Sequence, residues 1–326
     1  MGYNNQLHYL GGDLPSFIAT FNTANTSAGS SSATEVSLPY SSFSTYSGTI
    51  DWGDGTITAN NFANRTHNYA SSGVYTVTVK GEIGFFRYNN TEDKLKILSV
   101  LNWGGLQFNT FGIFRGCSNL QLNSVVGAPL NIVTLNGMFN GCSSLTTIQG
   151  VNSWDVSAVS DFNDIFVSCS SFNQDLNGWD TSNATNMLGT FYLATSFNGD
   201  ISGWDFSGVT DTRFMFYFAS SFNQNIGGWN TSSIALIGYM FQNCTSFNQD
   251  ISGWDFSNVT DMTSFMLGKS DANYTPVFYD NLLAKWVADG VSGVTIGMGG
   301  VKYTIAGASD RATINGVNTL TDGGQI

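Results

Sequence analysis

A repeat of 25 residues in the middle of the chain is the feature that most constrains the fold. Five tryptophans are each 25 residues from the next: Trp154, Trp179, Trp204, Trp229 and Trp254. Phenylalanines at two further positions keep the same step: Phe166, Phe191, Phe216 and Phe241, and Phe172, Phe197, Phe222 and Phe247. A fixed period of this length is typical of a solenoid, in which each repeat forms one coil. One coil cannot bury its own apolar side chains, so the repeats must stack.

The apolar positions within one repeat follow neither a helical nor a strand period throughout. We therefore expect a short strand, a turn and one helical or 3₁₀ turn in each coil. A glycine precedes the tryptophan of four coils and predicts a sharp corner there. These glycines are Gly178, Gly203, Gly228 and Gly253.

The four cysteines share one repeat position, which alanines fill in two intervening coils: Cys117, Cys142, Cys169, Cys244, Ala194 and Ala219. A position that accepts both residues indicates a small buried slot. We expect reduced thiols in the core, with a disulfide between adjacent coils as the alternative. The chain contains no Cys-x-x-Cys pair, which argues against a zinc site.

The N-terminal region has the pattern of β-structure from residue 14 to residue 83. Three segments mark it: Asp51-Trp-Gly-Asp-Gly55, Thr66-His-Asn-Tyr69 and Gly73-Val-Tyr-Thr-Val77. The Gly-Asp-Gly sequence supplies the positive φ angles of a tight hairpin. Together these segments resemble the PKD family, and the resemblance implies an immunoglobulin-like β-sandwich.

The repeat unit itself has a recognisable form. Its clearest copy is Cys244-Thr-Ser-Phe-Asn-Gln-Asp-Ile-Ser-Gly-Trp-Asp-Phe-Ser-Asn-Val-Thr-Asp-Met262. This unit resembles the BspA-like leucine-rich-repeat surface proteins. The resemblance implies a right-handed, leucine-rich-repeat-like solenoid with Phe, Met and Trp at the usual leucine positions. Members are mostly surface proteins linked to adhesion, and similar units occur in phage-encoded proteins.

The expected fold class is therefore mainly β: a PKD-like sandwich, then the solenoid, then an α+β cap at the C-terminus. An amphipathic helix is expected at residues 279–290, with Gly290 as its C-cap. The predicted domains are an N-terminal arm (1–13), the PKD-like sandwich (14–83), a connector (84–94), the solenoid (95–268) and the cap (269–326).

Charge and composition narrow the class of partner. The formal net charge is −12, with 11 basic residues, whereas nucleic acids and anionic membranes attract positive surfaces. Charged residues make up only 10% of the chain, so Ser, Thr, Asn and Gly must form much of the surface. No apolar run reaches the length of a membrane helix, and the first residues lack the pattern of a signal peptide.

Polar residues also repeat with the period of the coils. One row contains Asp155, Asp180, Asp205 and Asp255, with Asn230 at the gap, and a second contains Asp175, Asp200 and Asp250, with Asn225 at the gap. A third row contains Asn173, Asn198, Asn223 and Asn248. We expect the asparagines to hydrogen-bond turn backbones. Carboxylates stacked about 4.8 Å apart must face solvent, accept backbone N–H groups or share a cation such as calcium. A row that contacts a ligand is the remaining alternative.

Catalysis has little support in the sequence. The two histidines, His8 and His67, lie far apart, and no nucleophile elbow, metalloprotease motif or Walker loop is present. We interpret His67 as a hydrogen-bonding residue near the hairpin. Carboxylate pairs are plentiful, so a surface polysaccharide hydrolase is kept as an alternative function.

We predict a non-enzymatic binding protein at a virion surface or otherwise outside the cell, acting in host attachment as a phage fibre, tail-tip or head-decoration protein. A bacterial cell-surface adhesin is the first alternative. The predicted partners are a host glycan or protein receptor and, through the N-terminal region, other virion proteins. No cofactor is expected apart from the calcium alternative, and a homo-oligomer is left open.

Overall fold

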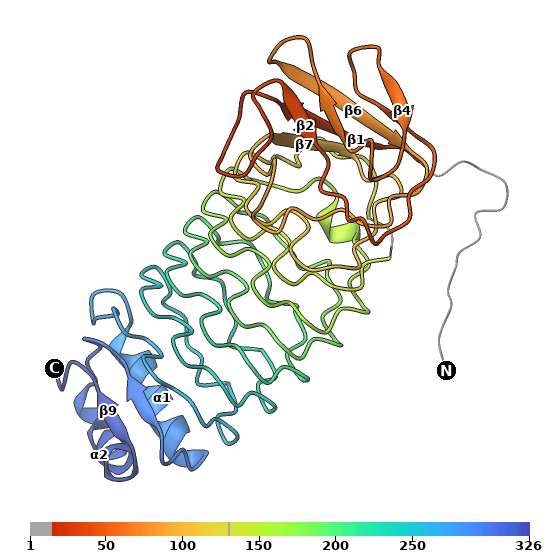
Figure 1. Cartoon of the computed structure of the whole chain (residues 1–326). Coiled ribbons are helices and arrows are strands. Elements are labelled where there is room, and N and C mark those ends of the chain that lie inside the picture. The colour runs from red at the N-terminus through yellow and green to blue at the C-terminus, as the bar shows by residue number, and fades with distance from the viewer. Residues whose placement is uncertain (1–14, 130) are drawn as a thin grey trace, which may run out of the picture.

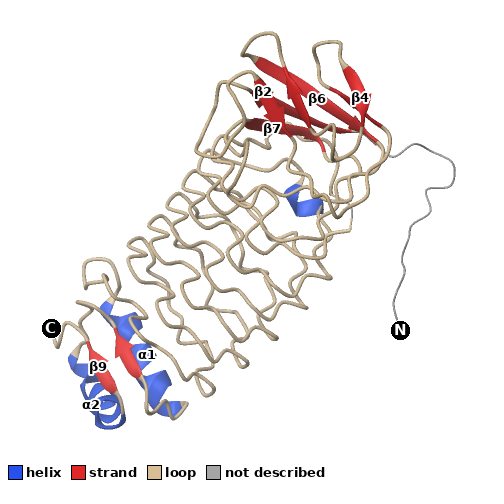
Figure 2. Cartoon of the chain, viewed as in Figure 1, coloured by secondary structure: helices blue, strands red, loops and turns tan. Residues whose placement is uncertain are grey.

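The computed structural model describes residues 15–129 and 131–326, so the arm predicted for residues 1–13 lies outside the described residues. Figure 1 shows three parts in a row: a β-rich N-terminal part, a stack of coils and a C-terminal part with helices. The chain is mainly β with few helices, as predicted. Figure 2 shows that most of the middle consists of loops and turns.

The N-terminal part contains one larger sheet and one strand pair. The larger sheet has the order β4-β3-β6-β1-β7, and its neighbouring strands are antiparallel. Its strands are β1 (Phe17–Asn22), β3 (Thr49–Asp51), β4 (Ile57–Ala59), β6 (Val74–Lys80) and β7 (Ile97–Asn102). The pair consists of β2 (Glu35–Ser37) and β5 (Thr66–Asn68). Buried and half-buried residues alternate along β1, the pattern of a strand with one face on the core.

The hairpin between β3 and β4 forms at the predicted Gly-Asp-Gly segment. Gly53 and Gly55 have φ angles of 81° and 93°, a left-handed conformation that glycine adopts without a steric penalty. The Trp52 amide donates to the carbonyl of Thr56 across the turn. His67 Nε2 lies 2.8 Å from Asp54 Oδ2 of this turn, in agreement with the hydrogen-bonding role interpreted for His67.

The N-terminal sheet and the coil stack share a strand. β7 lies within the range predicted for the solenoid, yet it pairs with β1 as the edge strand of the sheet. Its other side forms parallel bridges to the next coil, Ser99 to Gln121 and Asn102 to Val126. The segment predicted as a connector also contributes to the core, since Phe86 and Tyr88 are buried. The two parts therefore form one continuous core.

Successive coils are joined by backbone hydrogen bonds along the stack. Phe166 N donates to Thr190 O at 2.9 Å, and Phe191 N donates to Met215 O at 2.9 Å. Single-residue parallel bridges run along one side through Asp161, Asn186, Asp211, Leu236 and Asp261. The strand expected in each coil is thus reduced to one bridging residue, and turns take the place of most of the expected helical turns. The coil region does contain one 3₁₀ helix, η1 (Val151–Ser153).

Aromatic rings form columns inside the stack. The centroids of Phe166 and Phe191 lie 5.6 Å apart, those of Phe191 and Phe216 5.7 Å, and those of Phe216 and Phe241 5.6 Å. Trp179 stacks on Trp204 at 6.0 Å, with 3° between the ring planes. These rings are buried, and each column crosses several coils. Each coil adds one ring to each column, and the stacked rings together form a continuous aromatic core.

Four of the five indoles in the 25-residue row also donate a hydrogen bond to the preceding coil, whereas Trp154 Nε1, in the first coil of the row, has no partner among the described residues. The Nε1 groups of Trp179, Trp204 and Trp254 donate to the carbonyls of Val151, Leu176 and Ile226 at 2.9, 3.0 and 2.9 Å. Trp229 makes the same bond to Ile201 at 3.4 Å, and Phe206 stacks on its ring at 3.8 Å. The N–H groups of these four buried indoles are thus satisfied by the neighbouring coil, which fixes the register between the coils that they join.

The cysteines are free and buried, which confirms the prediction of reduced core thiols. The Sγ atoms of Cys142 and Cys169 lie 3.2 and 3.0 Å from the carbonyl oxygens of Phe114 and Phe139 in the preceding coil. Burial raises the pKa of the Cys244 thiol to about 12. This thiol is therefore protonated and unreactive at neutral pH.

The C-terminal part closes the last coil. It contains α1 (Pro276–Ala288), β8 (Thr295–Gly297), η2 (Ile305–Gly307), α2 (Ala308–Val317) and β9 (Thr319–Thr321). α1 begins three residues before the predicted start, with Pro276 in its first turn, and Gly290 just beyond its end has a φ of 71°. A parallel bridge from Met262 to Ile296 attaches β8 to the last coil. Within the described residues, no helix is long and apolar enough to cross a membrane.

We predict that Trp204→Ala lowers the free energy of unfolding by about 3 to 5 kcal/mol, because it removes a buried ring and one of the two donors to the Leu176 carbonyl, which keeps the Trp179 amide. Urea unfolding followed by circular dichroism measures the change. Phe43→Ala is the control, since Phe43 is 99% exposed and its removal should change the stability by less than about 0.5 kcal/mol. Equal effects of the two substitutions would contradict the packing described above.

Candidate functional site

The first aspartate row caps turns at the surface of the stack. Oδ1 of each residue accepts the backbone N–H of the serine two positions later, at 3.2, 3.0, 2.8 and 2.9 Å for Asp155, Asp180, Asp205 and Asp255. At the gap in the row, the Asn230 side chain accepts the Ser232 N–H in the same way at 3.2 Å. The position therefore requires an acceptor oxygen, whereas the charge is dispensable.

The second row accepts backbone N–H groups as well. Asp200 and Asp250 each accept the serine amide two residues later at 2.9 Å. Asp175 instead accepts the amide of Asp200 in the next coil at 2.8 Å. Asp250 also receives the side-chain amide of Asn281 in α1 at 2.9 Å, which connects the row to the C-terminal part.

The asparagine row forms a hydrogen-bond ladder along the stack. Oδ1 of Asn173 accepts the Asn198 amide at 2.9 Å, and Asn198 and Asn223 continue the ladder at 2.8 Å each. Asn248 ends it by accepting the amide of Thr275, just before α1, at 2.8 Å. Each side chain replaces a backbone acceptor at the turn of the next coil, in agreement with the predicted structural role.

The structure distributes the carboxylates along the stack instead of gathering them into one cleft. In residues 15–129 and 131–326, no group of three or more His, Cys, Asp or Glu side chains is arranged to hold a metal ion. Of the roles expected for the aspartate rows, the structure shows one: their carboxylates accept backbone N–H groups. Ligand contact by the rows, and calcium bound with other oxygen ligands, stay predictions.

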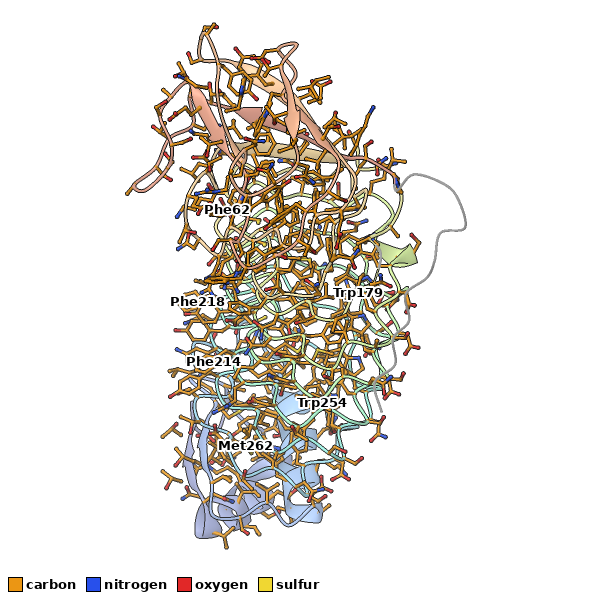
Figure 3. The ribbon with its side chains drawn as sticks, turned by 45° about the vertical axis from the view of Figure 1, so that its right-hand side comes forward. Phe62, Trp179, Phe214, Phe218, Trp254 and Met262 are labelled. Carbon is orange, nitrogen blue, oxygen red and sulfur yellow. The ribbon has the colours of Figure 1, made fainter. Side chains whose placement is uncertain are left out.

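A cluster of aromatic rings at the surface, four of them half-buried and one exposed, was not among the sites expected from the sequence. We call it the aromatic patch, and it consists of Tyr192, Phe214, Tyr217, Phe218 and Tyr239. Tyr192 and Tyr217 stack at 4.8 Å, and Phe214 and Tyr239 stack at 4.6 Å. Phe218 lies 4.7 Å from Tyr217 and is 38% exposed. Figure 3 shows Phe214 and Phe218 at the edge of the stack, whereas Trp254 lies inside it.

The aromatic patch occupies turn positions with strained backbones. Phe214, Phe218 and Tyr239 have φ angles of 59°, 56° and 63°, a left-handed conformation that is unfavourable for large side chains. Other coils carry Gly189 or Gly141 at these repeat positions. Comparing each coil with the repeat could have revealed the patch, because aromatic residues replace small ones there. Asp164, Leu193 and Ser264 have φ angles of 59°, 58° and 53° at the same repeat positions, so the left-handed conformation belongs to the turn of each coil.

An ion pair borders the aromatic patch. Arg213 Nη2 lies 2.6 Å from Asp211 Oδ2, and its Nε lies 3.0 Å from Asp211 Oδ1. This bidentate contact fixes the orientation of the guanidinium, and the hydrogen bonds to Asp211 raise the pKa of Arg213. The arrangement places half-buried and exposed rings next to fixed polar groups. It holds no nucleophile beside a base.

Stacked 25-residue coils and a sheet joined to their first strand define a repeat-containing protein. Two overlapping segments, residues 109–220 and 177–281, match the family described as "Mycoplasma protein of unknown function, DUF285". Together they span more than half of the chain, which therefore belongs to this family. The match supports a BspA-like surface protein. No curated protein and no solved structure matches the chain.

We predict that the aspartate caps make the stability depend on pH. Hydrogen bonds from Ser202 lower the pKa of Asp200, and those from Ser257 lower the pKa of Asp255. A carboxylate with a lowered pKa in the folded state contributes stability above its unfolded pKa of about 3.9 and loses it as the pH falls through the folded pKa. The free energy of unfolding should therefore fall below about pH 4.

Urea unfolding at pH 7, 5, 4 and 3 measures this dependence. The double variant Asp200→Asn, Asp255→Asn keeps both acceptor oxygens and should show a weaker decrease between pH 5 and pH 3. A decrease as steep as that of the original chain would contradict the capping role.

Proposed function

We propose that the chain is a non-enzymatic, surface-exposed binding protein that attaches a virion to its host. In this proposal the coil stack is a right-handed, leucine-rich-repeat-like solenoid that presents the binding surface. The PKD-like N-terminal part then contacts other virion proteins. The partner on the host is a glycan or a protein receptor, and no cofactor takes part.

The aromatic patch is the observation that carries the proposal. Monomeric proteins rarely place several large rings together at the surface unless the rings contact a partner. Tyr, Phe and Arg side chains contribute strongly to binding, because rigid rings bury much area at little cost in entropy. A stack held by buried aromatic columns keeps the patch rigid before the partner arrives, and this reduces the cost of binding.

The contacts of the described histidine and thiols support a function without catalysis. His67 is stacked on Trp52 at 5.1 Å and bound to Asp54, an arrangement that stabilises the hairpin. The thiols of Cys117, Cys142 and Cys169 are buried, and burial raises the pKa of each. Neither kind of side chain is prepared for attack on a substrate.

The proposal also names the location of the protein, on a virion or on a cell surface. Membership of a family of surface proteins supports exposure to the outside of a particle or a cell. We favour the virion, because the repeat resembles units that occur in phage-encoded proteins. A bacterial cell-surface adhesin would use the same binding surface.

Immunogold labelling of virions and cells from the source of the protein tests the location. We predict label on the virions. Label confined to the cell surface would replace the virion with the adhesin, and label confined to the cell interior would contradict both.

We predict that Tyr217→Ser combined with Phe218→Ser reduces binding of the purified protein to host cells at least tenfold, because two ring contacts of the aromatic patch are lost. Fluorescently labelled protein and flow cytometry measure the binding. Phe43→Ser serves as the matched control, since it removes an exposed ring from the N-terminal part. Unchanged binding by a folded double variant would contradict the role given to the patch.

A further inference from the structure

A hollow of about 370 Å³ lies where the N-terminal part meets the first coil. Three segments that are distant in the sequence line it: residues 39–42, 62–65 and 85–92. Its volume falls in the range of small-molecule sites. Phe62, which lines the hollow, is labelled in Figure 3 on the same edge of the molecule as Phe214 and Phe218.

Two arginines line this hollow, and each is held against an aromatic ring. The guanidinium carbon of Arg65 lies 4.1 Å from the centroid of Phe62. That of Arg87 lies 4.4 Å from Phe111 and 5.2 Å from Phe85. Stacking on a ring fixes the plane of a guanidinium and leaves its edge available for a planar, two-oxygen ligand.

Neither arginine forms an ion pair with a carboxylate in the described part of the chain, whereas Arg213 and Arg311 do. Arg65 Nε is buried and has no hydrogen-bond partner among the described residues. The contacts that the two guanidiniums do make are long: Arg65 to the Phe62 carbonyl at 3.4 Å and Arg87 to Thr110 at 3.5 Å. A guanidinium has five N–H donors, so most of this capacity is unused.

One carboxyl group faces the same hollow. Glu92 has a φ of 52°, and its Oε2 is buried without a hydrogen-bond partner in residues 15–129 and 131–326. Burial raises the pKa of Glu92, and the charge of Arg65 opposes that shift. Two arginines and one glutamate give the hollow a local charge of about +1 in a chain of net charge −12. This local excess favours a ligand with a single negative charge.

The remaining lining distinguishes between anions. Ser41, Ser42, Asn89 and Thr91 add hydroxyl and amide groups, and Tyr40 adds an aromatic wall. A multiply charged phosphate would be repelled by Glu92, whereas a ligand with several hydroxyls can donate to this carboxylate. The lining therefore combines donors for one carboxylate with an acceptor for hydroxyls.

We propose that this hollow binds a sugar carrying one carboxylate, of the uronic-acid class. Arg65 and Arg87 bind the carboxylate, and Glu92 accepts sugar hydroxyls. The inference rests on the proposed function in that it names an acidic glycan as the receptor. The hollow would then bind a glycan unit at one end of the face that also carries the aromatic patch.

Isothermal titration calorimetry of the full chain with glucuronic acid, glucose and a glucuronic-acid oligosaccharide tests the proposal. We expect saturable binding of glucuronic acid or of its oligosaccharide, and at least tenfold weaker binding of glucose. Tighter binding of the oligosaccharide identifies a polymer as the source, and equal binding identifies a terminal or free sugar. Binding of glucose as tight as that of glucuronic acid, or no binding of either acidic ligand, would overturn the proposal.

Variants locate the site. Arg87→Gln and, separately, Arg65→Gln should each weaken the binding of the acidic ligand at least tenfold with an unchanged circular dichroism spectrum. Lys80→Gln removes the same charge at an exposed position and should bind normally. If both arginine variants fold and bind like the original chain, the hollow is not the site. Such a failure would leave the surface location and the aromatic-patch result intact, so it can be told apart from a failure of the proposed function.

Discussion

The hydrogen bond from four buried indoles, one in each of four successive coils, to the preceding coil is the interaction on which the regular stack depends. Trp179, Trp204, Trp229 and Trp254 all donate to a carbonyl 28 residues earlier. The bond satisfies a polar group in an apolar interior and at the same time sets how far one coil is rotated relative to the next. Stacked phenylalanine columns then fill the space that this register defines.

Each end of the stack carries a buried lysine, which binds carbonyls of the N-terminal part at one end and of the last full coil at the other. Lys96 Nζ binds the carbonyls of Ser32 and Glu35 at 2.8 Å and lies 3.3 Å from Asp93. At the other end, Lys269 Nζ binds the carbonyls of Cys244 and Phe247 in the last full coil. Burial lowers the pKa of Lys269 to about 8, and its contacts with carbonyl oxygens offset part of the cost of burying the charge.

The 25-residue period of the tryptophans was sufficient to predict the stacked coils, the buried cysteines and the asparagine ladder. The cysteines and asparagines occupy fixed repeat positions, so each coil places them at the same point as the coil before it. The sharing of β7 between sheet and stack was not predictable, since an apolar strip such as Ile97–Asn102 is equally suited to either neighbour. The aromatic patch and the arginine-lined hollow depend on residues that depart from the repeat or come from distant segments. Their proximity is a property of the fold and not of any local pattern.

Hydrogen exchange of the indole N–H groups, followed by two-dimensional NMR, tests the central claim most directly. If these groups hold adjacent coils together, the indole protons of Trp179, Trp204 and Trp254 exchange only when the stack opens, and they are protected to a similar degree as the backbone amides between the coils. Exchange of these indole protons at the rate of an exposed tryptophan, while the backbone amides stay protected, would contradict the account.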